Sequence, residues 1–208
     1  MSPLRIHHVV TSLDIGGAEK HVARLAEAQA RNGHHVRVTY LKGSGALGLS
    51  LAQHGVRTES LGVNGWLGWS PVARLNRALR EDRPAIVHAH LFPAEVYAHL
   101  ASPGRKPWKL VATKHNDEDF LGKRRFAFLH RMLSANQDAV ICPSQHLRSF
   151  TLKTGARPAL PIFVIPYGID PAEASARHEA GRTPNLSGGQ DVRNSGGSAA
   201  HRTSRSLR

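Results

Sequence analysis

The sequence predicts an α/β fold: a single Rossmann-like domain in which helices flank a parallel sheet, followed by a disordered tail. Short, wholly apolar runs recur along the first 165 residues, as expected of strands that are buried on both faces of a parallel sheet. Segments with a helical spacing of apolar residues separate these runs. Such an alternation implies right-handed crossovers and an open sheet. The 208 residues suffice for one well-buried domain.

The predicted domain opens with the apolar run Ile6–Val10, which has the length of a buried strand. The helix predicted over Ala18–Ala30 places Val22, Leu25 and Gln29 on one side. The later strands are predicted by the same short apolar or alternating runs: Val36–Leu41, Arg57–Val63, Ala85–Ala89, Leu110–Thr113, Ala139–Cys142 and Ile162–Ile165.

Three further helices are predicted between these strands. Ser70-Pro71 has the pattern of an N-cap followed by proline at the first helical position, which predicts a helix over Pro71–Asp82. A third helix is predicted over Arg124–Ala135. The fourth, Ser144–Thr154, begins with a serine that we expect to cap it.

The α/β pattern stops near residue 170, which divides the chain into a domain, 1–170, and a tail, 171–208. The tail is rich in Gly, Ser, Arg, Ala and Asn, and it contains no Phe, Trp or Tyr. Such a segment buries too little surface to offset its ordering entropy, so we expect it to be disordered. Its composition favours a frameshifted or prematurely stopped reading frame over a native linker, although linkers share this composition.

The chain is basic, with a formal net charge of +13. Such a charge attracts nucleic acid, anionic lipid or phosphorylated small molecules. A nucleic-acid partner is not expected, because no aromatic-rich platform or binding motif accompanies the charge. The stretch Lys123–Leu133 joins basic and apolar residues, and it is either a core helix with a solvated start or a peripheral contact with a membrane.

Cysteine usage and the lack of a targeting segment favour a cytoplasmic protein. Cys142 is the only cysteine, so no intrachain disulfide can form, and its place at the end of an apolar strand suits a small buried residue. No signal-peptide pattern and no run of about 18 apolar residues occurs. We therefore expect a cytoplasmic chain that could lie at the inner face of a membrane.

The stretch Leu13–Glu19 joins the first strand to the first helix and contains the adjacent Gly16 and Gly17. Two glycines allow a sharp turn and the close approach of another group. The helix that follows directs its free N–H groups and a partial positive charge at the loop, which favours a phosphate-bearing ligand. The spacing is not G-x-G-x-x-G, and the alternative is a simple turn.

Polar side chains follow several predicted strands at their carboxyl ends, where open α/β sheets bind ligands. His88 and His90 are two residues apart and so share one face of their strand. His115 follows the next strand and is the best placed to contact a ligand or to act as an acid or base. His88 and His90 are either site residues or ordinary strand-end residues.

Other residues near these strand ends have competing interpretations. Lys114 and Asp117 are as compatible with solvated loop charges as with ligand contacts. His7 and His8 lie at the start of a strand and are not expected to carry chemistry, and the remaining histidines are expected on the surface or in packing. No metal site is predicted, because two histidines without a third ligand make a poor set.

Five motifs together resemble the N-terminal domain of retaining GT-B glycosyltransferases of the group 1 type. They lie at the expected strand ends in the expected order, over about residues 4–170. The motifs are Gly16-Gly17-Ala18-Glu19 with His21-Val22, His88-Ala89-His90, Lys114-His115-Asn116, Val140-Ile141-Cys142-Pro143-Ser144, and Val164-Ile165-Pro166-Tyr167-Gly168-Ile169-Asp170. Tyr167 stands where the family usually has asparagine.

The resemblance implies two Rossmann-like domains with the active site between them. The N-terminal domain would receive the acceptor, and the C-terminal domain would bind most of a UDP- or GDP-sugar donor. The reaction would retain anomeric configuration without a metal or other cofactor, in cell-surface glycan or glycolipid synthesis. His115 would lie near the transferred sugar as the catalytic-site residue. Donor or substrate contacts would come from Gly16, Gly17, Glu19, His88, His90 and Asn116.

The chain departs from the family because it ends where the second domain would begin. The family's paired glutamates, spaced E-x7-E, belong to that second domain, and the same spacing from Glu19 to Glu27 lies on the first helix and is taken as coincidence. We therefore expect an apparently truncated transferase with little activity alone. The alternatives are a non-catalytic binding module and one part of a split transferase.

Overall fold

The computed structural model describes residues 2–65, 67–104, 106–117, 124–157 and 159–168. Seven strands form one sheet in the order β3-β2-β1-β4-β5-β6-β7, and every adjacent pair is parallel. The predicted fold class is therefore confirmed. The strands are β1 Arg5–Ser12, β2 His35–Lys42, β3 Arg57–Ser60, β4 Ile86–His90, β5 Lys109–Thr113, β6 Ala139–Cys142 and β7 Ile162–Val164.

Within the described residues, six helices connect the strands, two more than the sequence predicts. They are α1 Gly17–Arg31, α2 Gly48–Gln53, α3 Trp69–Asp82, α4 Phe92–Leu100, α5 Arg124–Asn136 and α6 Gln145–Lys153. The missed helices have physical reasons for weak signals. Helix α2 has only six residues, and α4 is buried on almost every side, so neither shows an amphipathic period.

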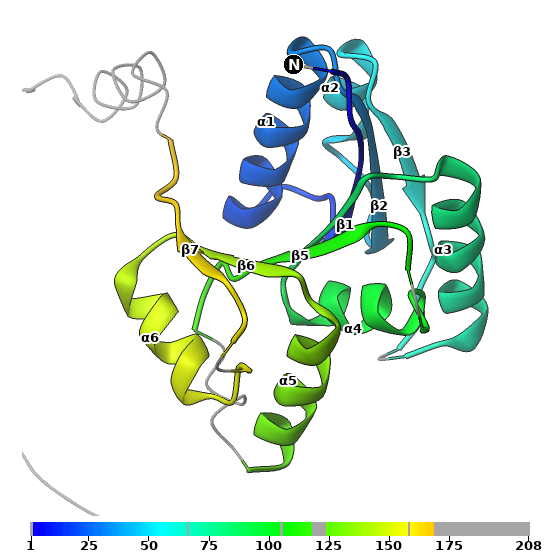
Figure 1. Cartoon of the computed structure of the whole chain (residues 1–208). Coiled ribbons are helices and arrows are strands. Elements are labelled where there is room, and N and C mark those ends of the chain that lie inside the picture. Colours follow the sequence, from blue (N-terminus) through cyan, green and yellow to red (C-terminus); the bar gives the residue numbers. More distant parts are fainter. Residues whose placement is uncertain (1, 66, 105, 118–123, 158, 169–208) are drawn as a thin grey trace, which may run out of the picture. The chain divides into compact units, whose positions relative to one another are not determined.

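Two separate hydrophobic cores cover the two faces of the sheet. Helices α1 and α2 pack on one face, where Val10 of β1 meets Val22 of α1 and Leu51 of α2. Helices α3 and α4 pack on the opposite face with Val9, the neighbour of Val10 (Figure 1). Successive side chains of a strand point to opposite faces, so a single strand supplies both cores.

Two helix starts were predicted from capping patterns, and the structure confirms one. The Oγ of Ser144 accepts a hydrogen bond from the N–H of Leu147 at 3.2 Å, which makes Ser144 the N-cap of α6. The predicted start at Pro71 was wrong, because α3 begins at Trp69 after an extended Gly68. Proline is tolerated there, since the first turn of a helix has no intrahelical use for its N–H groups.

Helix α5 contains most of the basic and apolar stretch that sequence interpretation left open. Its Leu133 is buried with Phe92 and Val96 of α4, and Phe126 and Leu129 pack against the same cluster. This arrangement supports the core-helix alternative. Among the described residues, no helix is both long and apolar enough to cross a membrane. Lys123 and the predicted disordered tail, 171–208, lie outside the described residues.

Candidate active site at the carboxyl edge of the sheet

The glycine pair lies where β1 gives way to α1. Gly16 is the extended N-cap residue of α1, and the carboxyl group of Glu19 folds back over its Cα, where no Cβ would fit. A Cβ on Gly17 would instead meet no atom within 4 Å. A Cβ at position 16 would therefore displace only the flexible end of the Glu19 side chain, whereas the space beside Gly17 is open to another molecule.

Asp14 ties this loop to the loop that follows β2. Its Oδ1 accepts hydrogen bonds from the N–H and Oγ of Ser44, at 2.8 and 2.6 Å, and from the N–H of Gly45 at 3.1 Å. These bonds, the Ser44 hydroxyl first, lower the pKa of the Asp14 carboxyl below its ordinary value. The loops after two neighbouring strands therefore form one connected rim.

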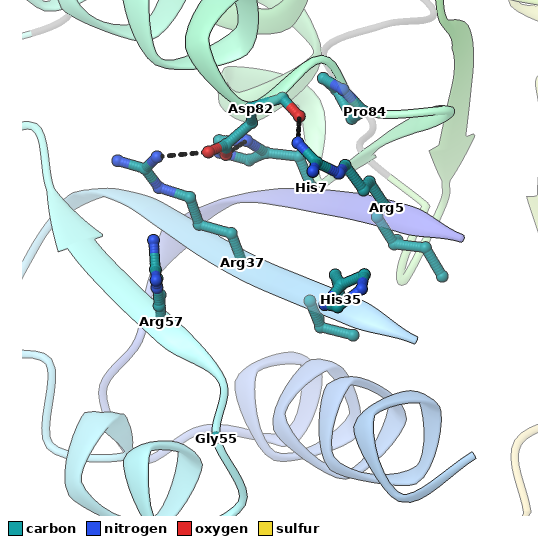
Figure 2. A pocket seen from close by; sticks show the side chains of 10 residues that line it. Arg5, His7, His35, Arg37, Gly55, Arg57, Asp82 and Pro84 are labelled. Atoms are coloured by element: carbon teal, nitrogen blue, oxygen red, sulfur yellow. Dashed lines mark hydrogen bonds and ion pairs between the residues drawn. The ribbon is translucent and has the colours of Figure 1, made fainter. Parts of the chain in front are cut away.

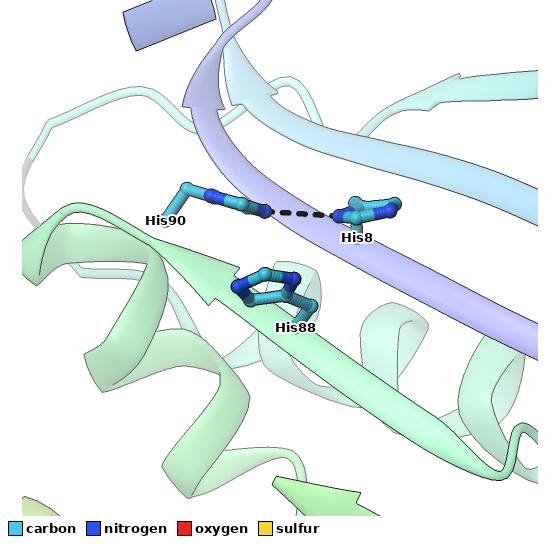
Figure 3. A group of neighbouring side chains, drawn as sticks. All are labelled: His8, His88 and His90. Carbon is cyan, nitrogen blue, oxygen red and sulfur yellow. Dashed lines mark hydrogen bonds between the residues drawn. The ribbon is translucent and has the colours of Figure 1, made fainter. Parts of the chain in front are cut away.

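Three buried histidines form a cluster beneath this rim. His8 of β1 lies directly beside His88 of β4 in the sheet register, and His90 follows on the same strand. Nδ1 of His8 and Nε2 of His90 are 2.9 Å apart (Figure 3). His8 was not expected to carry chemistry, and the structure places it in this buried, hydrogen-bonded cluster. The strand order that places β1 beside β4 is the missing signal, because it cannot be read from residue spacing.

The histidine cluster continues toward the rim as one chain of hydrogen bonds. Nε2 of His8 is 2.7 Å from Oε1 of Gln29 on α1, which forms one end of the chain. Nδ1 of His90 is 3.1 Å from Nε2 of His115, and Nδ1 of His115 is 2.6 Å from the Tyr167 hydroxyl. The chain therefore links helix α1 to the segment after β7 through three strands or strand ends.

Burial keeps these imidazoles neutral. Removal from water lowers the pKa of His8 and of His115 to about 4, and the pKa of both His88 and His90 falls well below the ordinary value for the same first reason. Burial also raises the pKa of the Tyr167 phenol to about 12. At neutral pH every ring in the chain thus carries one N–H, and the phenol keeps its proton.

The cluster has metal-ligating spacing. One nitrogen from each of His8, His88 and His90 lies within 4.8 Å of the others, so the sequence argument that a third ligand is lacking was wrong. The facing nitrogens of His8 and His90 already bond to each other, however, and Nε2 of His88 is 2.7 Å from Oγ1 of Thr113. The described contacts are satisfied without an ion, and the absence of a metal stays a prediction.

His21 lies beside the hydrogen-bond chain. The ring centroids of His21 on α1 and Tyr167 are 4.1 Å apart, and His21 is half-buried rather than a simple surface residue. His21, His88 and Tyr167 line a cavity of about 290 Å³ together with Gln29 and several isoleucines. The cavity runs from the rim along the α1 face of the sheet.

Neighbouring residues in the loop after β5 have different surroundings. Nζ of Lys114 is buried and lies 2.6 and 2.7 Å from the two carboxylate oxygens of Glu95 on α4, so the interpretation of Lys114 as a solvated loop charge was wrong. Asn116 and Asp117 are exposed, and Asp117 lies 3.3 Å from His146. Among the described residues of this loop, only His115 joins the hydrogen-bond chain.

The backbone is strained where β4 ends. Leu91 follows His90 and has φ 71° and ψ 154°, a region that residues with a Cβ rarely adopt. Its carbonyl accepts the hydrogen bond from the N–H of Glu95 that starts α4. Strain of this kind gathers at functional sites, and here it turns the chain between the histidine cluster and α4.

A second cavity, of about 310 Å³, lies at the opposite, amino edge of the sheet and is lined by basic residues (Figure 2). Asp82 occupies their centre. It lies 2.9 Å from His7 and from Arg37, and its backbone carbonyl accepts a bond from Arg5 at 2.9 Å. An internal carboxylate therefore partners much of this charge, which makes the edge a poorer anion site than its composition implies.

The carboxyl-edge arrangement can be compared with known proteins. The sequence pattern that defines Glycosyltransferase Family 4 matches residues 15–173, which include the glycine pair, His88, His90, His115 and Tyr167. The chain belongs to Glycosyltransferase Family 4. A search of curated proteins finds no match.

Solved structures share the fold of this Family 4 chain at low identity. HepE of Anabaena, in complex with UDP and glucose, is 20% identical with a TM-score of 0.66; the match covers 85% of this chain and 50% of HepE. A glycosyltransferase of Rickettsia africae is 16% identical with a TM-score of 0.63, over 86% and 50% of the chains. Sucrose-phosphate synthase of Thermosynechococcus elongatus is 15% identical with a TM-score of 0.60; the match covers 84% of this chain and 52% of the synthase.

These matches confirm the predicted N-terminal half of a GT-B fold. The Family 4 chain spans about half the length of the solved structures it matches.

Proposed function

We propose that this chain is the acceptor-side domain of a glycosyltransferase that moves a sugar from a nucleotide-sugar donor to a glycan or glycolipid, with retention of configuration. The observation that carries the proposal is the meeting of His115 and Tyr167 with His21, one turn after Gly17 on α1, at the carboxyl edge of a sheet within the family match. HepE, which shares this fold, binds UDP and glucose, and that complex supports a UDP-sugar as the donor class.

Each site residue has a role that its surroundings support. The open space beside Gly17 and the N-terminus of α1 would receive the donor diphosphate. His115, half-buried at the rim, would lie near the transferred sugar, and the exposed Asn116 would contact donor or acceptor. His90 has no exposed surface and both of its nitrogens bond to histidines, so it would act on substrate only through His115.

Binding is tested by titrating the isotopically labelled chain with UDP and with UDP-glucose and following amide shifts. We expect the shifts to concentrate at residues 16–19 and near His115. His115→Ala should weaken the response about tenfold, while His35→Ala, an exposed histidine at the amino edge, should leave it unchanged. Shifts confined to the basic residues around Asp82 would overturn the proposed site.

Transfer is a separate question, because the chain spans half the length of the structures it matches. We propose that efficient transfer needs a second, donor-binding unit, since preorganised charge on the departing diphosphate is usually a large part of such catalysis. Radiolabelled sugar transfer by the purified chain should be near background, and should rise when a donor-binding chain of the family is supplied. Robust transfer by the chain alone would contradict this part.

A lipid-linked acceptor would bring the domain to a membrane surface. Phe128 and Met132 on α5 are exposed, at 73% and 41%, in a stretch rich in basic residues. We propose a peripheral contact there that requires anionic lipid. Sedimentation with anionic vesicles should retain the chain and neutral vesicles should not; equal retention by both, or by neither, rejects the contact.

A further inference from the structure

We propose that Gln29 on α1 sets the direction of the hydrogen-bond chain through His8, His90 and His115, so that the oxygen of Tyr167 accepts a hydrogen bond from a sugar hydroxyl. The inference rests on the proposed function only for its ligand. It assigns Gln29, His8 and His90 as positioning residues and Tyr167 as a residue that contacts the sugar.

The direction follows from counting protons along the chain. Oε1 of Gln29 is a carbonyl oxygen and can only accept, so Nε2 of His8 must carry the N–H that spans 2.7 Å. A neutral imidazole has one N–H, which leaves Nδ1 of His8 as an acceptor. Nε2 of His90 must then donate across the 2.9 Å contact to His8.

The same count continues to the rim. Nδ1 of His90 has no proton left, so Nε2 of His115 donates to it across 3.1 Å. Nδ1 of His115 is then an acceptor, and the hydroxyl of Tyr167 donates to it across 2.6 Å. All four bonds therefore point from Tyr167 toward Gln29. Reversing any one of them reverses all, because no ring can donate twice while neutral.

The consequence lies at the exposed end. The Tyr167 side chain is 38% exposed, and its single proton is committed to His115. Its oxygen retains lone pairs for a ligand but has no proton to give. A sugar hydroxyl can donate to this oxygen, whereas an unprotonated phosphate oxygen cannot. The chain would thus favour the sugar over the diphosphate at this point and orient the donor between Gly17 and Tyr167.

Neighbouring groups leave this direction undisturbed. His88 stacks on the chain, with its ring centroid 4.1 Å from that of His90, but its Nε2 is paired with Thr113. His21 contacts the ring of His115 edge-on and the ring of Tyr167 in a tilted arrangement, without a described bond to either. With its carbonyl oxygen turned toward His8, Gln29 is the terminal group that sets the direction of the four bonds.

The test is a long-range ¹H–¹⁵N spectrum of the histidine rings in the unliganded chain at neutral pH, with single His→Gln variants for assignment. We expect His8, His90 and His115 all to carry the proton on Nε2. Gln29→Glu, an acceptor of similar shape, should keep this pattern. Gln29→Lys, which only donates, should move all three protons to Nδ1, and Gln53→Lys on the exposed end of α2 is the matched control.

Tyr167→Phe keeps the assay informative where Gln29→Lys fails to fold. It removes the hydroxyl at the exposed end of the hydrogen-bond chain. The three histidine rings should retain the proton on Nε2, because Gln29 sets the direction. A proton on Nδ1 of His115 in the wild type, or a His115 tautomer that follows Tyr167 rather than Gln29, would overturn the inference.

Ligand binding is the second readout. Tyr167→Phe should weaken UDP-glucose binding on the order of tenfold and leave UDP binding unchanged, since UDP lacks the transferred glucose. An equal loss for both ligands would overturn the assigned sugar contact. Because the ring spectra need no ligand, a failure of the proposed function and a failure of the hydrogen-bond chain give different results.

Discussion

Replacing Lys114 with methionine should destabilise the domain severely. Lys114 is 5% exposed, and its ammonium group forms short contacts with both carboxylate oxygens of Glu95, whose side chain is fully buried. The amide of Gln137 donates a further bond to the same carboxylate at 2.9 Å. Lys114→Met removes the only basic partner that the described residues give this carboxylate and leaves a negative charge enclosed by protein.

The size of the effect follows from that burial. Removing one member of a buried ion pair costs about 3–5 kcal/mol, because the remaining charge has no water to solvate it. For a domain of this size each kcal/mol lowers Tm by roughly 2–4 °C, so the variant should melt roughly 6–20 °C below the wild type. An exposed pair supplies the scale: Arg77 and Glu81 on α3 are 3.8 Å apart at 72% and 64% exposure. Arg77→Met should cost about 0.5 kcal/mol or less.

Urea unfolding followed by circular dichroism measures both variants against the wild type. The double variant Lys114→Met with Glu95→Leu should recover most of the loss, since it removes both charges together. A cost below about 1 kcal/mol for Lys114→Met, or a double variant no more stable than the single one, would refute the reasoning.

Three other perturbations test separate features of the fold. Stability should fall as pH drops from 6.5 toward 4, because His8 and His115 bind protons in the unfolded chain but keep pKa values of about 4 when folded. The fully buried His8 alone accounts for about 3 kcal/mol. Urea unfolding midpoints that stay constant over that pH range would contradict this. Ser144→Ala should cost about 1 kcal/mol in urea unfolding by removing the N-cap bond to Leu147. An unchanged free energy of unfolding would show that this bond does not stabilise α6. Gly43→Ala should cost about 1–2 kcal/mol in thermal unfolding, since φ is +102° there, and a neutral result would refute the strain.

The placement of the site was predictable because it depends on chain direction alone. Parallel strands end at one edge, so the glycine pair, His115 and Tyr167 could be expected to meet there before any strand order was known. His8 could not be foreseen, because its value depends on β1 lying next to β4 in a register that sets it beside His88. A change of strand order would have left the same sequence pattern with a different set of neighbours.

Burial explains most of the remaining differences. Lys114 could not be interpreted as an ion-pair partner because Glu95 lies on α4, a helix without the apolar periodicity that predicts one. Gln29 was expected on the inner side of α1 through its spacing, yet its bond to His8 depends on how α1 packs over the sheet. Pairings between elements are three-dimensional facts, and residue spacing within one element does not contain them.

The contact between His8 and His90 joins residues 82 positions apart, across the β1–β4 pairing. Closing so long a loop is among the entropically costly steps of folding, and a slip of one residue would turn His8 to the other face of the sheet. The hydrogen-bond chain can therefore form only after β1 and β4 have docked in their final register. The loss of protons from these histidines during refolding would therefore report the docking of β1 against β4. A chain folded in the wrong register would lack the hydrogen bonds that reach the rim.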